Sequence, residues 1–154
     1  MTHEFPTPED TMEFGRSLGR SLRAGDLVLL AGPLGAGKTT LTRGIADGLG
    51  VGGRVSSPTF VLARVHPAGA AGVPLVHVDA YRLGGDLSEL DDLDLDTDLE
   101  RSAIVVEWGE GSAERLSSDY LVVRLDRRED DVREVVLEPH GTWADRTPEL
   151  AKTS

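Results

Sequence analysis

Residues 27–40 read LVLLAGPLGAGKTT, and this stretch decides the fold. The apolar run at residues 27–31 is short and flanked by polar residues, which predicts a strand buried on both faces of a sheet. A glycine-rich loop follows at residues 32–37, and a helix is predicted from residue 38 to about residue 49, where Gly50 ends it. A strand, a glycine loop and a helix in this order are the context that a phosphate-binding loop requires.

The loop itself has the spacing Gly32-x-x-x-x-Gly37-Lys38-Thr39, a complete Walker A motif. In such a loop, backbone N–H groups surround the phosphates of a nucleotide, and the N-terminus of the following helix adds a favourable dipole. We expect Lys38 to bridge the β- and γ-phosphates of ATP and the Thr39 hydroxyl to ligate Mg²⁺. The chain has one other lysine, Lys152.

The rest of the chain predicts one α/β domain around this unit. Thr7 and Pro8 begin a helix that extends to about Leu22, with Thr7 as the N-cap. Strands are predicted at residues 59–65, 75–79, 103–107, 120–125 and 132–137, the last two forming an antiparallel hairpin at a sheet edge. We therefore expect a three-layer P-loop NTPase-like α/β domain with a mostly parallel central sheet. The domain should span residues 1–140, followed by a flexible C-terminal tail at 141–154.

Two of the predicted strands end in a carboxylate, Asp79 and Glu107. The carboxyl ends of strands are where open α/β sheets bind ligands, so both residues are candidates to hold Mg²⁺ or to position the attacking water. An exposed acid at a strand end is the alternative for each. His77 lies on the same strand face as Asp79, but a lone histidine is more often a packed residue than a catalyst, so it is not assigned to the site.

Composition excludes several classes of function. The chain lacks cysteine, which rules out thiol catalysis and cysteine-based zinc sites. It shows neither a secretory signal nor an apolar run of about 20 residues, so we expect a cytoplasmic protein with no membrane association. A formal net charge of −11 opposes direct binding of DNA or RNA by this chain alone. The acidic, leucine-studded residues 86–100 are a solvated face or a partner surface rather than a calcium loop.

Two short segments have open interpretations on their residues alone. Ser57-Pro58-Thr59 lies where nucleotide switches sense the γ-phosphate, but it is also an ordinary turn before a strand. Trp108 follows Glu107 and could stack on a base, although a packed aromatic side chain explains it equally well.

Four motifs in order closely resemble the TsaE (YjeE) family: GPLGAGKTT at residues 32–40, SPTF at 57–60, HVDAYRL at 77–83 and VEW at 106–108. The resemblance covers roughly residues 7–138. It implies a slow ATPase subunit that supports the formation of threonylcarbamoyladenosine beside the tRNA anticodon. In that family the protein works with TsaD and TsaB, which stimulate it, and the transfer chemistry belongs to TsaD.

The resemblance also implies roles for individual residues. It gives Thr39 and Glu107 to Mg²⁺, and a catalytic or metal-positioning role to Asp79. Thr59 becomes a switch residue, and Lys38 is catalytic together with the two acids. The implied ATP contacts are Gly32, Gly35, Ala36, Gly37, Lys38, Thr39, Thr40 and Trp108. Pro33, Ala80 and Gly109 depart from the common family pattern, which affects loop rigidity and removes no phosphate or metal ligand.

Three rival functions were weighed against this interpretation. A regulatory GTPase would need an Asn-Lys-x-Asp segment to recognise guanine, and the chain contains no asparagine. A small-molecule P-loop kinase is the principal alternative, because it shares the phosphate loop and the size of the domain. A protein that binds ATP without turnover is the third, and only measured hydrolysis separates it from an ATPase.

Overall fold

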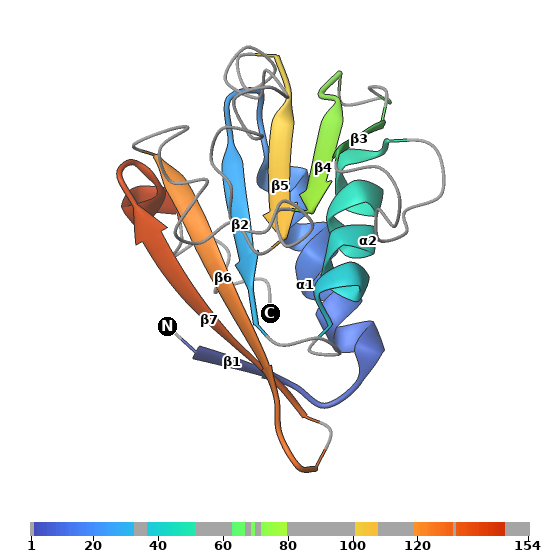
Figure 1. Cartoon of the computed structure of the whole chain (residues 1–154), viewed down its shortest axis with the longest axis vertical. Coiled ribbons are helices and arrows are strands. Elements are labelled where there is room, and N and C mark those ends of the chain that lie inside the picture. The colour runs from blue at the N-terminus through green and yellow to red at the C-terminus, as the bar shows by residue number, and fades with distance from the viewer. Residues whose placement is uncertain are drawn as a thin grey trace.

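The computed structural model describes residues 2–32, 37–51, 63–66, 69, 72–79, 101–107, 119–130 and 132–146 of the chain. Figure 1 shows how the elements are arranged. They are β1 (Thr2–Phe5), α1 (Pro8–Ser21), β2 (Leu27–Ala31), α2 (Lys38–Leu49), β3 (Ala63–His66), β4 (Leu75–Asp79), β5 (Ala103–Glu107), β6 (Tyr120–Arg127) and β7 (Arg133–His140). Neither of these helices is long and apolar enough to span a bilayer.

The strands form one sheet in the order β1-β7-β6-β2-β5-β4-β3. The four strands β6, β2, β5 and β4 are mutually parallel, whereas β6 and β7 form an antiparallel hairpin. The predicted mostly parallel centre and antiparallel hairpin are therefore confirmed. The predicted strand at residues 59–65 appears as β3 from Ala63 onward, and residues 59–62 lie outside the described residues.

The sequence predicts the hairpin at the edge of the sheet, but the structure places another strand, β1, outside it. β1 pairs with β7 in antiparallel fashion, from Thr2 opposite Val136 to Phe5 opposite Arg133, and so takes the edge position. β7 also continues to His140, three residues beyond its predicted end at residue 137. These added residues lengthen the hairpin, because β6 and β7 stay paired from Tyr120–His140 to Arg127–Arg133.

β2 is buried on both faces, as predicted. Val28 and Leu30 belong to the core formed with the two helices, and Leu27 and Leu29 on the other face are also fully buried. α1 and α2 lie against each other on one face of the sheet (Figure 1). Among the described residues no helix covers the opposite face, so they show two of the three expected layers.

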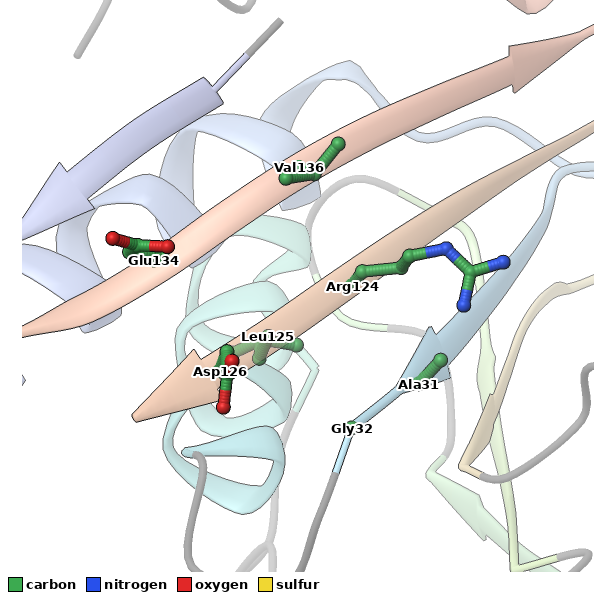
Figure 2. Close-up of a pocket in the computed structure, with 7 residues that line it drawn as sticks. All are labelled: Ala31, Gly32, Arg124, Leu125, Asp126, Glu134 and Val136. Atoms are coloured by element: carbon green, nitrogen blue, oxygen red, sulfur yellow. The ribbon is translucent and has the colours of Figure 1, made fainter. Parts of the chain in front are cut away.

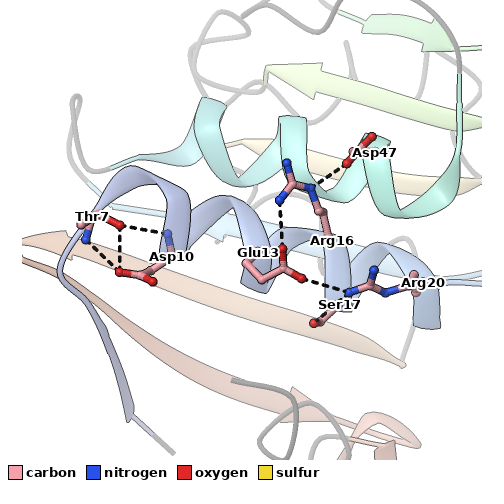
Figure 3. A network of polar contacts seen from close by, with 7 residues as sticks. All are labelled: Thr7, Asp10, Glu13, Arg16, Ser17, Arg20 and Asp47. Atoms are coloured by element: carbon pink, nitrogen blue, oxygen red, sulfur yellow. Dashed lines mark hydrogen bonds and ion pairs between the residues drawn. The ribbon is translucent and has the colours of Figure 1, made fainter.

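α1 starts with a capping box. Thr7 Oγ1 accepts a hydrogen bond from the Asp10 backbone N–H at 3.3 Å, and the Asp10 carboxylate accepts one from the Thr7 N–H at 3.1 Å (Figure 3). Further along, Arg16 donates to Glu13 on its own helix and to Asp47 on α2. Hydrogen bonds from Arg16 and Arg20 hold the pKa of Glu13 below its usual value. The Arg16–Asp47 pair links the two helices at their surface, and exposed pairs of this kind add little stability.

Close contact between the helices is made possible by two pairs of glycines, Gly15 and Gly19 on α1 with Gly44 and Gly48 on α2. A Cβ atom on Gly44 would lie 2.9 Å from the Gly15 Cα atom and would also collide with the carbonyl oxygen of Met12. Both neighbours are backbone atoms, which cannot rotate away as a side chain can. The glycines therefore set the position of α2, the helix that begins at the Walker A lysine.

The chain after β7 also packs against the domain. Trp143 is 1% exposed, and the Arg146 guanidinium lies 3.8 Å from the centre of its ring. Arg146 donates two hydrogen bonds, of 2.7 and 2.9 Å, to the carboxylate of Asp26 just before β2. The structure thus differs from the expected flexible tail over residues 141–146, and residues 147–154 lie outside the described residues.

The glycine contact predicts the effect of Gly44→Ala. In an isolated helix this change is stabilising by roughly 0.5–1 kcal/mol. Here the added methyl group meets backbone, so we expect the free energy of unfolding to fall by about 1–3 kcal/mol. Denaturant unfolding measures the difference, with Arg43→Ala, at an exposed position on the same helix, as the control. A Gly44→Ala protein as stable as the wild type would contradict the close approach of the helices.

Candidate functional site

The glycine loop leaves β2 at Gly32 and enters α2 at Gly37. Gly32 has φ 138° and Gly37 has φ 106°, conformations that favour glycine. At Gly32 a side chain is excluded by space as well, because a Cβ atom would collide with the Leu125 carbonyl oxygen on β6. The first and last glycines of the motif are therefore required by the backbone. Gly35 and Ala36 lie outside the described residues.

Lys38 is the first residue of α2, and it is 5% exposed. Its Nζ donates a 2.7 Å hydrogen bond to the Gly32 carbonyl oxygen. Because Gly32 opens the loop and Lys38 follows its end, this bond connects the two ends of the loop. The ammonium group is thus held at the loop, beside the N-terminus of α2, where the helix dipole favours an anion.

Thr39 and Thr40 follow in the first turn of α2, and both are half-buried. The turn is stabilised from within, because Thr42 Oγ1 donates a 2.9 Å hydrogen bond to the Lys38 carbonyl oxygen. The two threonines therefore lie where the motif needs them, directly after the lysine at the helix N-terminus.

The two predicted carboxylate residues are brought side by side at the carboxyl edge of the sheet. Glu107 ends β5, which pairs directly with β2 and places Glu107 opposite Leu30, two residues before the loop. Asp79 ends β4 and lies opposite Glu107 in the adjacent parallel pair. Their expected placement at strand ends on the carboxyl edge is confirmed, and the structure adds that the two strands are neighbours. The side chain of Asp79 lies outside the described part of the structure.

Glu107 has a partner that the sequence analysis did not include. The side chain of Glu107 is 5% exposed and that of His77 is fully buried, and His77 Nε2 lies 2.6 Å from Glu107 Oε2. A buried carboxylate needs hydrogen-bond donors, and His77 supplies one. The available signal was the spacing His77-x-Asp79, which places the histidine two residues before the end of the strand, on the same face as Asp79. Its partner, 30 residues away, could be identified only with the strand order in hand.

Arg133 is a second residue that sequence reasoning did not assign to the site. It begins β7, and its Nε atom lies 3.7 Å from the position that a Cβ atom on Gly37 would occupy. The start of β7 therefore brings the Arg133 guanidinium close to Gly37, the last glycine of the loop. In the sequence, Arg133 is one of several arginines near the turn, and nothing distinguishes it.

Figure 2 shows a hollow beside the start of the loop, with a volume of about 330 Å³. Its lining residues are Ala31, Gly32, Arg124, Leu125, Asp126, Glu134 and Val136. Arg124 is paired with Glu138 at 2.7 Å, and this hydrogen bond holds the pKa of Glu138 below its usual value. The lining combines charged side chains of both signs with apolar ones, and among the predicted site residues it includes Gly32.

The donor set fits a magnesium ion bound together with a nucleotide. Across the described residues, no group of three or more histidine, aspartate or glutamate side chains could hold a metal by itself. Mg²⁺ does not need such a group, because it is usually held by one or two protein oxygens, phosphate oxygens and water. Glu107 offers a buried carboxylate with one oxygen bound to His77, and Thr39 offers a hydroxyl at the helix start.

Thr59 and Trp108, the expected switch residue and the expected neighbour of the nucleotide, lie outside the described residues. The acidic stretch at residues 86–100 lies outside them as well. The described site therefore consists of the ends of the glycine loop, the first turn of α2, and the carboxyl ends of β4 and β5.

Comparison with known proteins shows the family of the chain. The sequence model of the family described as threonylcarbamoyl adenosine biosynthesis protein TsaE matches residues 5–135. The chain is 61% identical to the tRNA threonylcarbamoyladenosine biosynthesis protein TsaE of Streptomyces coelicolor, with 86% of this chain and 93% of that protein covered. It is 36% identical to the Bacillus subtilis protein of the same name, with 87% and 82% covered.

A solved structure has the same fold. The crystal structure of Bacillus subtilis YdiB superimposes with a TM-score of 0.79 and 29% sequence identity, covering 99% of this chain and 94% of that one. The matched region contains β2, the glycine loop and the two acidic strand ends. The chain belongs to the TsaE family of tRNA threonylcarbamoyladenosine biosynthesis proteins.

Proposed function

We propose that this protein is a cytoplasmic, Mg²⁺-dependent ATPase subunit that acts with TsaB and TsaD in tRNA threonylcarbamoyladenosine biosynthesis. The observation that carries the proposal is the arrangement around Lys38. A buried ammonium group is bonded to the first glycine of the loop, and a buried carboxylate ends the neighbouring strand. Such an arrangement combines positive charge for phosphates with an acid for their metal.

Binding of ATP would replace the contact between Lys38 and Gly32 with contacts to phosphate. The ammonium would turn from the carbonyl oxygen to the β- and γ-phosphates, where charge accumulates during transfer. Backbone N–H groups from Gly35 through Thr40 would bind the remaining phosphate oxygens. Trp108 would lie beside the nucleotide, and Thr59 would respond to the γ-phosphate.

Thr39 and Glu107 would hold the metal, and Asp79 would orient water or the switch. When bound, Mg²⁺ supplies charge neutralisation at the β- and γ-phosphate oxygens. The pairing of Asp79 opposite Glu107 supports a division of labour between them, because neighbouring strand ends can serve the metal and the attacking water separately.

A small-molecule kinase is the alternative, and it differs in where the phosphoryl group goes. A kinase needs a site for the acceptor and a segment that excludes water from it. The hollow beside Gly32 lies against the hairpin, and it does not include Lys38, Asp79 or Glu107. This hollow therefore gives no support to an acceptor site beside those three residues.

Lys38→Ala should reduce ATP hydrolysis by about 100-fold or more, because the phosphates lose their main cationic contact. The measurement is release of labelled phosphate, with product analysis to show whether it reaches water or another acceptor. Lys152→Ala, at the only other lysine of the chain, is the matched control and should behave as wild type. Hydrolysis by Lys38→Ala at the wild-type rate would exclude the Walker A site as the ATPase centre.

Turnover should rise when TsaB and TsaD of the same organism are added, because a site that is slow alone is often completed by another chain. Addition of tRNA alone should have no effect, since a net charge of −11 opposes docking on a polyanion. Both are measured by phosphate release and by tRNA binding at about 150 mM salt. Tight binding of tRNA would refute the electrostatic argument, and indifference to both proteins would refute the partnership.

The two carboxylates should respond differently to replacement. Glu107→Ala should raise the Mg²⁺ concentration needed for nucleotide binding, whereas Asp79→Ala should slow hydrolysis more than it weakens binding. A Mg²⁺ titration of nucleotide affinity and of turnover for both variants separates these effects. The opposite pattern would exchange the two roles, and two neutral variants would remove both acids from the site.

A further inference from the structure

The contact between His77 and Glu107 is made inside the core rather than at the surface. Both side chains are at most 5% exposed, and the 2.6 Å distance between Nε2 and Oε2 is short for a hydrogen bond that involves nitrogen. The bond crosses from β4 to β5, where His77 is in register with Val105 and Glu107 with Asp79. It therefore runs diagonally toward the end of β5, onto the carboxylate in register with Leu30, two residues before the glycine loop.

We propose that His77 is a positioning residue for magnesium binding, which fixes the carboxylate of Glu107 by occupying Oε2 and leaves Oε1 for the metal or a water bound to it. This inference rests on the proposed function, in which Glu107 holds Mg²⁺. Outer hydrogen bonds of this kind set the orientation of a ligating carboxylate, and their removal lowers metal affinity. The Oε2 atom is the one that the histidine holds, so the orientation of the carboxylate is defined before the metal arrives.

Packing alone does not account for a histidine at this position. The residues of β4 on either side, Val76 and Val78, are apolar and buried, and so is Val105 opposite His77. Burying an imidazole in such surroundings is unfavourable unless its nitrogens are hydrogen-bonded. Across the described residues, Nδ1 of His77 has no hydrogen-bond partner, so the bond to Glu107 is the one polar contact that offsets this burial.

The Glu107 carboxylate is likewise buried with fewer hydrogen bonds than it can accept within the described part of the chain. A carboxylate accepts several hydrogen bonds, and within the described part of the chain Glu107 receives one, from His77. An anionic group buried with a single donor is stabilised further by a cation. The pair therefore has one oxygen committed to the fold and one available to a ligand, and the histidine determines which is which.

Replacing His77 by glutamine or by leucine separates positioning from packing. Glutamine keeps an N–H donor at nearly the reach of Nε2, and leucine removes it. We expect His77→Leu to raise the Mg²⁺ concentration at half-maximal binding of a fluorescent nucleotide by about 10- to 100-fold. His77→Gln should recover most of this loss. Nucleotide affinity measured in EDTA should be the same in all three proteins, because the phosphate loop is intact.

Val105→Ala is the matched control for a defect in the core. Val105 is buried on the adjacent strand in register with His77, and it makes no polar contact with Glu107. It should lower the thermal midpoint and leave the Mg²⁺ requirement unchanged. If His77→Leu does not fold, His77→Asn takes its place, because its amide is too short to reach Glu107 and should show the same metal defect that glutamine corrects.

Glu107→Ala, measured in the same titration, tests the assignment of Mg²⁺ to Glu107 separately from the positioning role of His77. If it does not alter the Mg²⁺ requirement, the assignment of the metal to Glu107 fails, and this inference fails with it. If Glu107→Ala raises the requirement but His77→Leu, or His77→Asn in its place, does not, the positioning role alone is wrong. Equal metal defects in the glutamine and leucine variants would likewise contradict the role of the N–H donor.

Discussion

The burial of β2 between two parallel neighbours is the constraint on which the rest of the structure depends. All five residues of the strand are buried, and β5 and β6 pair with it along nearly its whole length. The chain therefore leaves β2 at Gly32, at the carboxyl edge of the sheet. β5 ends at the same level in Glu107, and the glycine contacts between α1 and α2 set the direction in which the chain returns. Strand order and helix packing together determine where the lysine and the carboxylate lie.

Two charged side chains described at this edge of the sheet, Lys38 and Glu107, are buried. They are 5% and 4% exposed; Lys38 bonds to Gly32 and Glu107 to His77. Isolated buried charges are costly, whereas a nucleotide with its metal brings both a polyanion and a cation to the same place. The short internal contacts hold these groups in position until such a ligand replaces or completes them.

The features that sequence analysis predicted correctly are local. The buried run at 27–31, the capping residue Thr7 and the glycines at 37 and 50 each act within a few residues, so their patterns identify β2, α1 and α2 directly. The strand-end positions of Asp79 and Glu107 were predicted for the same reason, because each ends an apolar run.

The features that were missed depend on partners far along the chain. β1 has four residues and becomes a strand by pairing with β7. Arg146 is held by Asp26, 120 positions earlier, which is why a segment without a pattern of its own packs on the domain. The role proposed for His77 depends on its contact with Glu107, 30 positions later in the chain. None of these pairings leaves a periodic signal in the sequence.

The central claim is that the Walker A loop and Glu107 form one nucleotide and metal site. The most direct measurement is a crystal structure of the protein with a non-hydrolysable ATP analogue and Mn²⁺ in place of Mg²⁺, with the metal located by its anomalous scattering. We expect an anomalous peak between Thr39 and Glu107. The Lys38 ammonium should then contact phosphate oxygens instead of the Gly32 carbonyl oxygen. A nucleotide bound elsewhere, such as the hollow beside Arg124, with Lys38 still on Gly32, would contradict it.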